Sequence, residues 1–485
     1  MSNKKEPLLQ TQSSNGPPIV PDGSSWPNLF EETYEMLLAS IIVYGVMDLR
    51  TLARNGLLTN NFHTQLLLDL PISASDIVKL VSQNRDALHD EIGQGSTELY
   101  LSAFDNLVDP QDSFEVELDP SSGETKILLN SVEIVMVDDE NSDTELVYGI
   151  CVNIVKKQIT LIFRGCTTTK DWRISADPFL IKQEIRLNVT DEKAMYIFIH
   201  RGFYNYLLHP SHSATGTLQK NKFERICDNL QRLLERYPGY RIYCTGHSLG
   251  GALATVFAFE FAVSSTSTAT TMTPTSDPVT CITFASPMVG NLSFEQAFTE
   301  LERQGRLRAL RVTNHFDIFT QLPDRASYLY AILCCGGPHF VAYYIAWSCM
   351  FFACCQNRIY RHVGMDLHLY KNERYKMKHA TGSSPNFWFR LAQDWKRLWK
   401  QTLQRLVTVP FVCFCDYCYC KEDFSTNHGC EEHLKRLQNV SQELSGMYLN
   451  DLYTKRIQGT RNSERERTSG VDCMAKGKVI LGDEM

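Results

Sequence analysis

The residues best suited to chemistry in this sequence lie at positions 246–252, which read Gly-His-Ser-Leu-Gly-Gly-Ala. Ser248 stands between glycines, after an apolar stretch that predicts a strand and before one that predicts a helix. Glycines at such a turn remove Cβ clashes, so the serine hydroxyl can be exposed in a strained backbone conformation at a helix N-terminus. The setting predicts a nucleophilic serine; the alternative is a glycine-rich helix start that happens to contain a serine.

The elements that must position this serine are predicted from hydrophobic periodicity. Apolar residues recur with helical spacing over residues 29–49, and residues 73–76 are suited to cap a helix that starts at Ile77. From about residue 113 the period changes toward two. Candidate strands fall at 132–137, 146–155, 158–163, 240–244, 279–285, 308–313 and 365–370, and candidate helices at 223–237, 250–263 and 293–304. This alternation predicts an α/β fold with a mostly parallel sheet.

The composition is that of a globular protein. The chain has 485 residues, of which 43% are hydrophobic and 21% charged, and these values exclude a disordered or fibrous protein. There are 48 Lys and Arg against 55 Asp and Glu, which gives a net charge of −7. No overall basic field exists to hold nucleic acid, so nucleic acid is not an expected partner.

The first ten residues are polar and charged and contain no apolar core of a secretory signal. We therefore expect a cytoplasmic protein that is not secreted, in which the 16 cysteines do not form a disulfide framework. Four cysteines stand singly in apolar strand or helix patterns and are expected to be small core residues: Cys151, Cys227, Cys244 and Cys281.

Several further blocks carry a family resemblance. They are residues 159–165 (I-T-L-I-F-R-G), 170–172 (K-D-W), 199–203 (I-H-R-G-F), 284–291 (F-A-S-P-M-V-G-N), 312–317 (V-T-N-H-F-D) and 322–323 (L-P). With the serine turn, this stretch from about residue 145 to residue 323 resembles the class 3 (fungal-type) lipases of the α/β-hydrolase superfamily. The resemblance implies an α/β-hydrolase core with a mostly parallel sheet, to which this chain adds a helical N-terminal extension and an apolar, Cys-rich C-terminal insertion.

The resulting domain organisation has four parts. We expect a disordered tail over residues 1–26, a helical region over 27–110, the lipase-like domain over 111–455 and a second disordered tail over 456–485. Within the domain we expect an apolar insertion at 331–356 and a Cys-rich segment at 411–420.

The resemblance also implies a Ser–Asp–His triad in that chain order. Ser248 would attack an ester carbonyl, and Asp317 would orient and stabilise the histidine. The alternative for Asp317 is a helix cap or turn residue after the strand at 308–313. Its place at the C-terminal end of a strand, where sites of α/β proteins gather, favours the catalytic interpretation.

Two histidines compete for the role of general base. Residues 360–364 (Y-R-H-V-G) resemble a family block whose histidine precedes a strand and is not the base, which places His362 at a strand edge. Residues 428–434 (H-G-C-E-E-H-L) resemble the late H-x-x-x-x-Y-L block, with His433 in place of the tyrosine. The base of an α/β-hydrolase lies on a loop after the last strand, so we favour His428, keep His362 as the alternative, and rank His379 and His433 lower.

The oxyanion hole is expected to use the backbone N–H groups of Leu249 and Cys166. The family usually has Ser or Thr at the second of these positions, and a thiol is a weaker donor than a hydroxyl, so Thr167 is an alternative source of a side-chain hydroxyl. Residues 168–180 lie where the family carries its lid, and Trp172 would suit its apolar inner face. The alternative is a surface loop with a few buried anchors.

The apolar stretch 340–355 is the feature that the catalytic motifs leave unexplained. Its sixteen residues include Ser348 as the one polar side chain. As a helix it would span about 24 Å, less than the ~30 Å hydrocarbon core of a membrane. An interfacial or re-entrant segment, or an acyl-binding wall, fits better, and a buried core helix is the alternative.

The C-terminal cysteines invite a zinc interpretation. Cys413, Cys415, Cys418 and Cys420 have C-x-C-x₂-C-x-C spacing, but zinc sites usually pair two separated knuckles. Acylated cysteines beside an interfacial surface are at least as consistent with the aromatic residues between them. No metal site is therefore predicted, no D-x-D-x-D-G calcium loop is present, and no cofactor is needed.

The sequence thus predicts a serine ester hydrolase, a lipase that cleaves acyl esters of glycerolipids through an acyl-enzyme. The expected substrate is an acylglycerol or a phospholipid, met at a membrane or lipid-droplet surface. The alternatives are a phospholipase or acyltransferase that uses the same acyl-serine, and a catalytically silent hydrolase fold that serves as a lipid-binding scaffold.

Overall fold

The structure is a computed structural model that describes residues 26–107, 114–116, 127–129, 132–177, 179–187, 194–209, 211–212, 218–264, 277–315, 317, 319–323, 360–371, 373–379 and 426–453. The apolar insertion, the Cys-rich segment and almost all of the two predicted tails lie outside these residues, and the predicted domain boundaries remain predictions. Residues Pro27–Leu449 form one compact unit, which holds every element named below.

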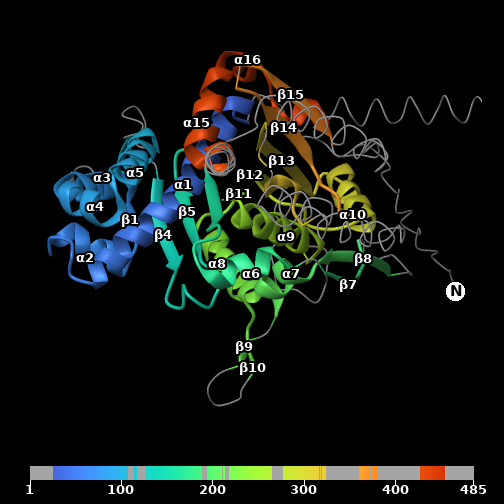
Figure 1. Ribbon diagram of the computed structural model, residues 1–485, viewed down its shortest axis with the longest axis horizontal. Coiled ribbons are helices and arrows are strands. Elements are labelled where there is room, and N and C mark those ends of the chain that lie inside the picture. Colours follow the sequence, from blue (N-terminus) through green and yellow to red (C-terminus); the bar gives the residue numbers. More distant parts are fainter. Residues whose placement is uncertain are drawn as a thin grey trace, which may run out of the picture. The chain divides into compact units, whose positions relative to one another are not determined.

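A nine-stranded sheet forms the centre of this unit, in the order β1-β4-β5-β6-β11-β12-β13-β14-β15 (Figure 1). Its strands are β1 (Ile72–Ser73), β4 (Val132–Asp138), β5 (Tyr148–Asn153), β6 (Gln158–Phe163), β11 (Arg241–His247), β12 (Val279–Phe284), β13 (Leu307–Asn314), β14 (Met365–Leu369) and β15 (Tyr375–His379). The strands from β6 to β14 run parallel, whereas the pairs toward both edges are antiparallel. The expected parallel sheet is confirmed at the centre. The edge pairs are antiparallel because their strands follow one another directly along the chain, and short connections favour antiparallel pairing. These strands are β4, β5 and β6 at one side and β14 and β15 at the other.

Helices cover the sheet and extend beyond one of its edges. They are α1 (Leu29–Arg54), α2 (Phe62–Asp69), α3 (Ala74–Gln83), α4 (Arg85–Ile92), α5 (Gln94–Leu107), α6 (Thr169–Ser175), α7 (Arg201–Leu208), α8 (Lys222–Arg236), α9 (Leu249–Ser264), α10 (Leu292–Arg303), α15 (Cys430–Asn439) and α16 (Ser441–Ser445), with a 3₁₀ turn η2 (Phe319–Gln321). Helices α2 to α5 form the blue cluster at the left of Figure 1, and α1 runs from it toward the red helix α15.

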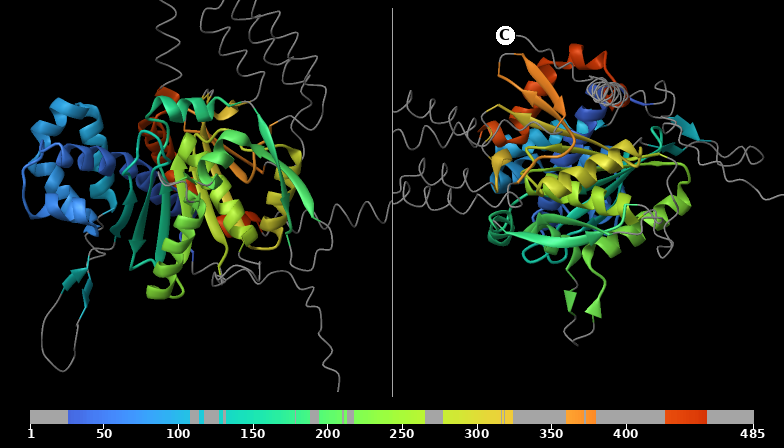
Figure 2. Two further views of the ribbon diagram at one scale, coloured as in Figure 1. Left: turned by 90° about the horizontal axis from the view of Figure 1, so that it is seen from below. Right: turned by 90° about the vertical axis from the view of Figure 1, so that its right-hand side faces the viewer.

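The described residues also form three two-stranded ribbons: β2 (Phe114–Val116) with β3 (Ile127–Leu129), β7 (Leu180–Ile185) with β8 (Met195–His200), and β9 (Ser211–His212) with β10 (Leu218–Gln219). Figure 2 shows the β7–β8 ribbon standing apart from the main sheet. None of the three ribbons was expected from the sequence.

The predicted helix starts are explained by side-chain caps. Ser73 accepts from the Asp76 N–H at the start of α3, and Asn221 forms a reciprocal capping box with Glu224 at the start of α8. The Asn291 side chain accepts from the Ser293 and Phe294 N–H groups at the start of α10, without a reciprocal bond. The strands and helices predicted from periodicity agree with the observed bounds within a few residues.

Helix α1 is long and apolar enough to cross a membrane, but 78% of its most apolar window is buried inside the protein. It packs on β6, β11 and β12, the strands that also contact α9. Alternate residues of β11 face the two helices: Tyr243 and Thr245 bond to residues of α1, whereas Cys244 joins the core around α9. Helix α1 is therefore a core helix in this structure, and the sheet lies between it and α9.

A buried polar cluster ties α1 to the sheet. The Glu32 carboxylate accepts hydrogen bonds from the Tyr243 hydroxyl, at 2.7 Å, and from the Arg308 guanidinium. The side chains of Glu32 and Arg308 are both almost completely buried. Such a pair contributes little net stability when intact, but loss of one partner leaves a buried charge uncompensated.

We predict that Glu32→Ala destabilises the fold by about 3–5 kcal/mol, because it leaves Arg308 buried without its carboxylate. Glu31→Ala is the matched control, since Glu31 precedes it on the same helix and is exposed. Urea unfolding followed by circular dichroism measures both. Equal, small effects of the two substitutions would show that α1 is not anchored through Glu32.

Candidate active site

The turn between β11 and α9 holds Ser248 in a left-handed backbone conformation, with φ at 57°. The neighbouring glycines are required by close backbone contacts. A Cβ on Gly250 would lie 2.1 Å from the Phe163 carbonyl oxygen, and one on Gly246 would lie 2.5 Å from the Gly250 carbonyl carbon. The predicted tight strand-to-helix turn is present, and it places a strained serine at the N-terminus of a helix.

The structure brings His428 and Asp317 to this serine. The His428 Nε2 atom lies 2.9 Å from Ser248 Oγ, and its Nδ1 atom lies 3.1 and 3.0 Å from the two oxygens of Asp317. The Asp317 side chain is buried, whereas His428 retains slight exposure. A carboxylate that accepts from Nδ1–H leaves Nε2 as the atom that can accept the serine proton.

The loop that carries His428 is held on both sides by buried hydrogen bonds. Asn314, at the end of β13, donates to the Asn427 carbonyl at 2.9 Å. The fully buried Arg436 of α15 donates to the Asn427 side chain and to the His315 carbonyl. Asn314 belongs to the quoted block 312–317, but its support of the His428 loop was not predicted, and no sequence pattern distinguishes Arg436 from an ordinary helix-surface arginine.

The two expected oxyanion donors lie on either side of the serine turn. Leu249 is the first residue of α9, and Cys166 follows β6 on the neighbouring strand. Burial raises the pKa of the Cys166 thiol to about 11, and the Leu249 N–H and the Ser175 hydroxyl lie beside its sulfur. The thiol therefore stays neutral at physiological pH, while Thr167, the alternative, is exposed.

Helix α6 occupies the position that the sequence predicts for a lid. The Trp172 ring, 48% exposed, lies 6.1 Å from the ring of Phe319, and the Phe319 ring lies 4.4 Å from that of His428. Helix α6 also borders a groove of about 850 Å³. Basic side chains line much of this groove: Lys170, Arg173, Arg201, Lys222 and Arg225.

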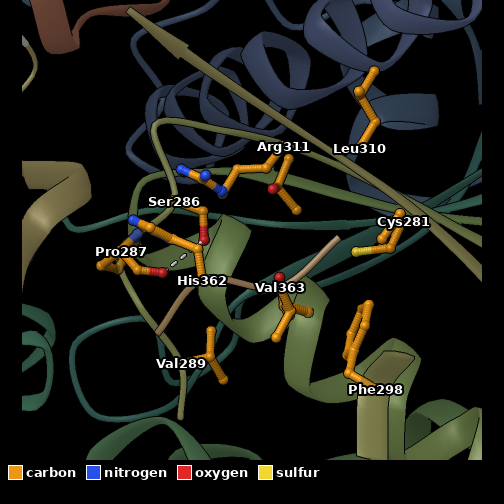
Figure 3. A pocket seen from close by; sticks show the side chains of 12 residues that line it. Cys281, Ser286, Pro287, Val289, Phe298, Leu310, Arg311, His362 and Val363 are labelled. Carbon is orange, nitrogen blue, oxygen red and sulfur yellow. Dashed lines mark hydrogen bonds between the residues drawn. The ribbon is translucent and has the colours of Figure 1, made fainter. Parts of the chain in front are cut away.

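The alternative base, His362, lies elsewhere. Figure 3 shows it beside Ser286 and Pro287, in a small cavity of about 10 Å³ that Cys281 and Phe298 also line. The structure therefore places His428, and not His362, within hydrogen-bonding distance of Ser248. Of the lower-ranked histidines, His379 bonds to Glu302 at 2.9 Å, and His433 is buried near Phe284.

No group of three or more potential metal ligands occurs in the part of the chain that the structure describes. The Cys413–Cys420 cluster and the candidate acylated cysteines lie outside that part, so their chemistry stays a prediction. The four cysteines expected in the core are confirmed there: Cys151, Cys227, Cys244 and Cys281 are all buried.

The parallel central sheet, the strained serine after β11 and the histidine on a late loop together define an α/β-hydrolase. Residues 160–326 match the family model of class 3 lipases. This match agrees with the resemblance that the motifs quoted from its sequence predict, and it covers about a third of the chain.

Curated relatives match parts of the chain. Phospholipase A1-IIgamma of Arabidopsis thaliana is 28% identical over 35% of this chain and 39% of its own length. The putative lipase LIH1 of Saccharomyces cerevisiae is 27% identical over 47% of this chain and 61% of its own. The chloroplastic galactolipase DONGLE of Arabidopsis thaliana is 30% identical over 44% of this chain and 41% of its own. The matches thus span less than two thirds of these relatives.

Buried histidines make the fold sensitive to acid. Burial lowers the pKa of His200 and of His247 to about 3 and that of His433 well below 6.5. In the unfolded chain these groups bind protons below about pH 6.5, while the native state does not. Stability therefore falls as pH drops below that value, until it reaches the native-state pKa.

We predict that His433→Phe reduces this acid sensitivity. Neither ring nitrogen of His433 has a hydrogen-bond partner among the described residues, so an apolar ring loses no such bond. Urea unfolding between pH 6 and pH 4.5 should show a slope of free energy against pH smaller by about one proton, or ~1.4 kcal/mol per pH unit. An unchanged slope would mean that His433 is already protonated in the native state.

Proposed function

We propose that this chain is a serine ester hydrolase that cleaves acyl esters of glycerolipids at a lipid surface. The observation that carries the proposal is the continuous hydrogen-bonded arrangement of Ser248, His428 and Asp317 at a strained turn. The match of residues 160–326 to the class 3 lipase model, and the lipase, phospholipase and galactolipase names of the relatives, support the substrate class.

In the proposed reaction, Ser248 Oγ attacks the ester carbonyl while His428 Nε2 takes its proton. Asp317, bonded to Nδ1, stabilises the imidazolium that forms. His428 then returns the proton to the departing alcohol, which leaves an acyl group on the serine. A water molecule, deprotonated by the same imidazole, attacks this acyl-enzyme and releases the fatty acid.

The tetrahedral oxygen of each step needs fixed donors. We assign this role to the backbone N–H groups of Leu249 and Cys166, which follow the paired strands β11 and β6. The start of α9 adds the positive end of a helix dipole. The thiol in place of the usual hydroxyl leaves the backbone donor itself unchanged.

A lipid surface is supported by the residues around α6. Trp172 and Phe179 are each about half exposed, and Phe179 lies under the Arg201 guanidinium at 4.6 Å. Large aromatic side chains next to cations are suited to the interface between acyl chains and headgroups. Association with a membrane or lipid droplet is therefore part of the proposal.

A phospholipase is the second candidate, and the groove beside α6 favours it. Lys170 and Arg173 face this groove. Lys170 donates to the Thr144 carbonyl, and the two carboxylates that line the groove, Glu145 and Asp177, pair with other cations: Lys222, Arg225 and Arg201. Such side chains suit a phosphate-bearing headgroup better than a neutral acylglycerol. Release of fatty acid from matched vesicles of phospholipid and emulsions of acylglycerol separates the two substrates.

We predict that Ser248→Ala and His428→Ala each lower hydrolysis of a soluble short-chain ester by about 10³-fold or more, at unchanged melting temperature. His362→Ala is the matched control: it should lower thermal stability first and turnover only in part, because its side chain lies in the small cavity. A well-folded His362→Ala protein without activity, beside an active His428→Ala protein, would reverse the assignment. Substantial hydrolysis by folded Ser248→Ala would overturn the proposed nucleophile.

We predict that the double substitution Trp172→Ala with Phe179→Ala weakens co-sedimentation with liposomes several-fold. Hydrolysis of the soluble ester should change less, because neither residue bonds to the reacting groups. Phe62→Ala is the control, since this exposed aromatic residue belongs to α2. Equal loss of binding in the control would refute a specific role for the α6 surface.

A further inference from the structure

The hydroxyl of Tyr44, on helix α1, contacts Gly165 in the segment after β6 and His247, the residue that precedes Ser248. It accepts a hydrogen bond from the Gly165 N–H at 3.0 Å, and it lies 3.4 Å from His247 Nδ1. Burial raises the pKa of Tyr44 well above its usual value, so the hydroxyl keeps its proton. The Tyr44 oxygen accepts from the Gly165 N–H, and its own proton can therefore be donated to His247 Nδ1.

His247 links the Tyr44 hydroxyl to His428 through a second hydrogen bond. Its Nε2 atom lies 2.6 Å from the carbonyl oxygen of His428. Burial lowers the pKa of His247 to about 3, so the ring is neutral and carries one proton. A ring that accepts at Nδ1 must donate from Nε2, which is the geometry that the His428 carbonyl requires.

The contact between Tyr44 and Gly165 leaves no space for a side chain at position 165. A Cβ added there would lie 2.1 Å from the Tyr44 hydroxyl oxygen and 2.7 Å from the His247 carbonyl oxygen. The hydroxyl is thus wedged against the residue that precedes Cys166, the expected oxyanion donor. This steric fit is independent of the hydrogen bonds and points to the same location.

We propose that Tyr44 is a positioning residue, whose hydroxyl fixes the oxyanion loop at Gly165 and, through His247, the backbone of His428 relative to Ser248. The proposal rests on the proposed function and assigns part of that function to the helical N-terminal region. Without the hydroxyl, the Gly165 N–H loses its acceptor and His247 loses the bond that fixes its tautomer. Small displacements of reacting groups are costly, on the order of 10²-fold in rate for about 1 Å.

The test is Tyr44→Phe, which keeps the ring and removes only the hydroxyl. We expect the rate of Ser248 labelling by a fluorophosphonate, and kcat for a soluble short-chain ester, to fall about 10- to 100-fold. KM should change less than about twofold, because Tyr44 is not among the residues that line the groove beside α6. Tyr100→Phe is the matched control: it removes a hydroxyl that bonds to Asp48 at 2.8 Å in the same helical region, and it should leave kcat per active site unchanged.

A double-mutant cycle distinguishes positioning from general destabilisation. If Tyr44 acts through His247, the loss of kcat in Tyr44→Phe with His247→Asn should be no greater than the larger single loss. If the two single losses of kcat instead multiply in the double mutant, Tyr44 and His247 act independently, and the proposed relay of hydrogen bonds from Tyr44 through His247 to His428 is overturned. His247→Asn alone also tests it if Tyr44→Phe does not fold: a reduced kcat at unchanged KM supports the relay, and native kcat refutes it.

The outcomes also separate this proposal from the proposed function. If the native protein neither reacts with the fluorophosphonate nor hydrolyses esters, the proposed function is wrong and the relay falls with it. If the native protein reacts and Tyr44→Phe reacts at the same rate, only the relay is overturned. Equal losses in Tyr44→Phe and Tyr100→Phe would likewise refute it, because they would indicate loosening of α1 as a whole.

Discussion

The close approach of β6 to the first turn of α9 is the constraint on which the site depends. The Phe163 carbonyl occupies the space that a side chain at position 250 would need, so the strand and the helix meet backbone to backbone. This contact fixes where the helix begins, and the helix start forces Ser248 into its strained conformation. The neighbouring strand then delivers Cys166 to the same place, because β6 and β11 are paired in parallel register. Because Gly250 has no Cβ, this contact can form, and it positions Ser248 and both expected oxyanion donors, Leu249 and Cys166.

The parts of the fold that follow from local chemistry could be predicted from the sequence. Glycine spacing predicts the serine turn, capping residues predict the start of α3, and apolar runs predict the central strands. The β7–β8 ribbon was missed because β7 mixes charged and apolar residues without a period-two pattern, so the apolar run of β8 has no visible partner strand. The antiparallel edges were missed for a different reason, since strand direction is a property of the connections and not of the strands.

The choice between His362 and His428 could not be made with certainty from the sequence. His362 and His428 both precede regular elements, and neither chain spacing nor residue type determines which one reaches Ser248. The choice depends on tertiary hydrogen bonds from Asn314 and Arg436 to the neighbour of His428, residues that are 113 and 9 positions away from Asn427. Tyr44 is a stronger case, because its contact with Gly165 spans 121 positions. Such contacts leave no local pattern, so they had to come from the structure.

The separation of Ser248 from His428 along the chain also has a consequence for synthesis. These residues are 180 positions apart. At ribosomal rates of about 5–20 residues per second, the serine turn exists for on the order of 10–40 s before its histidine is translated. During that interval the sheet from β4 to β12 can fold around a hydroxyl that has no imidazole to accept its proton. A nascent chain therefore holds Ser248 without the imidazole that the proposed function requires until the segment before α15 has been made.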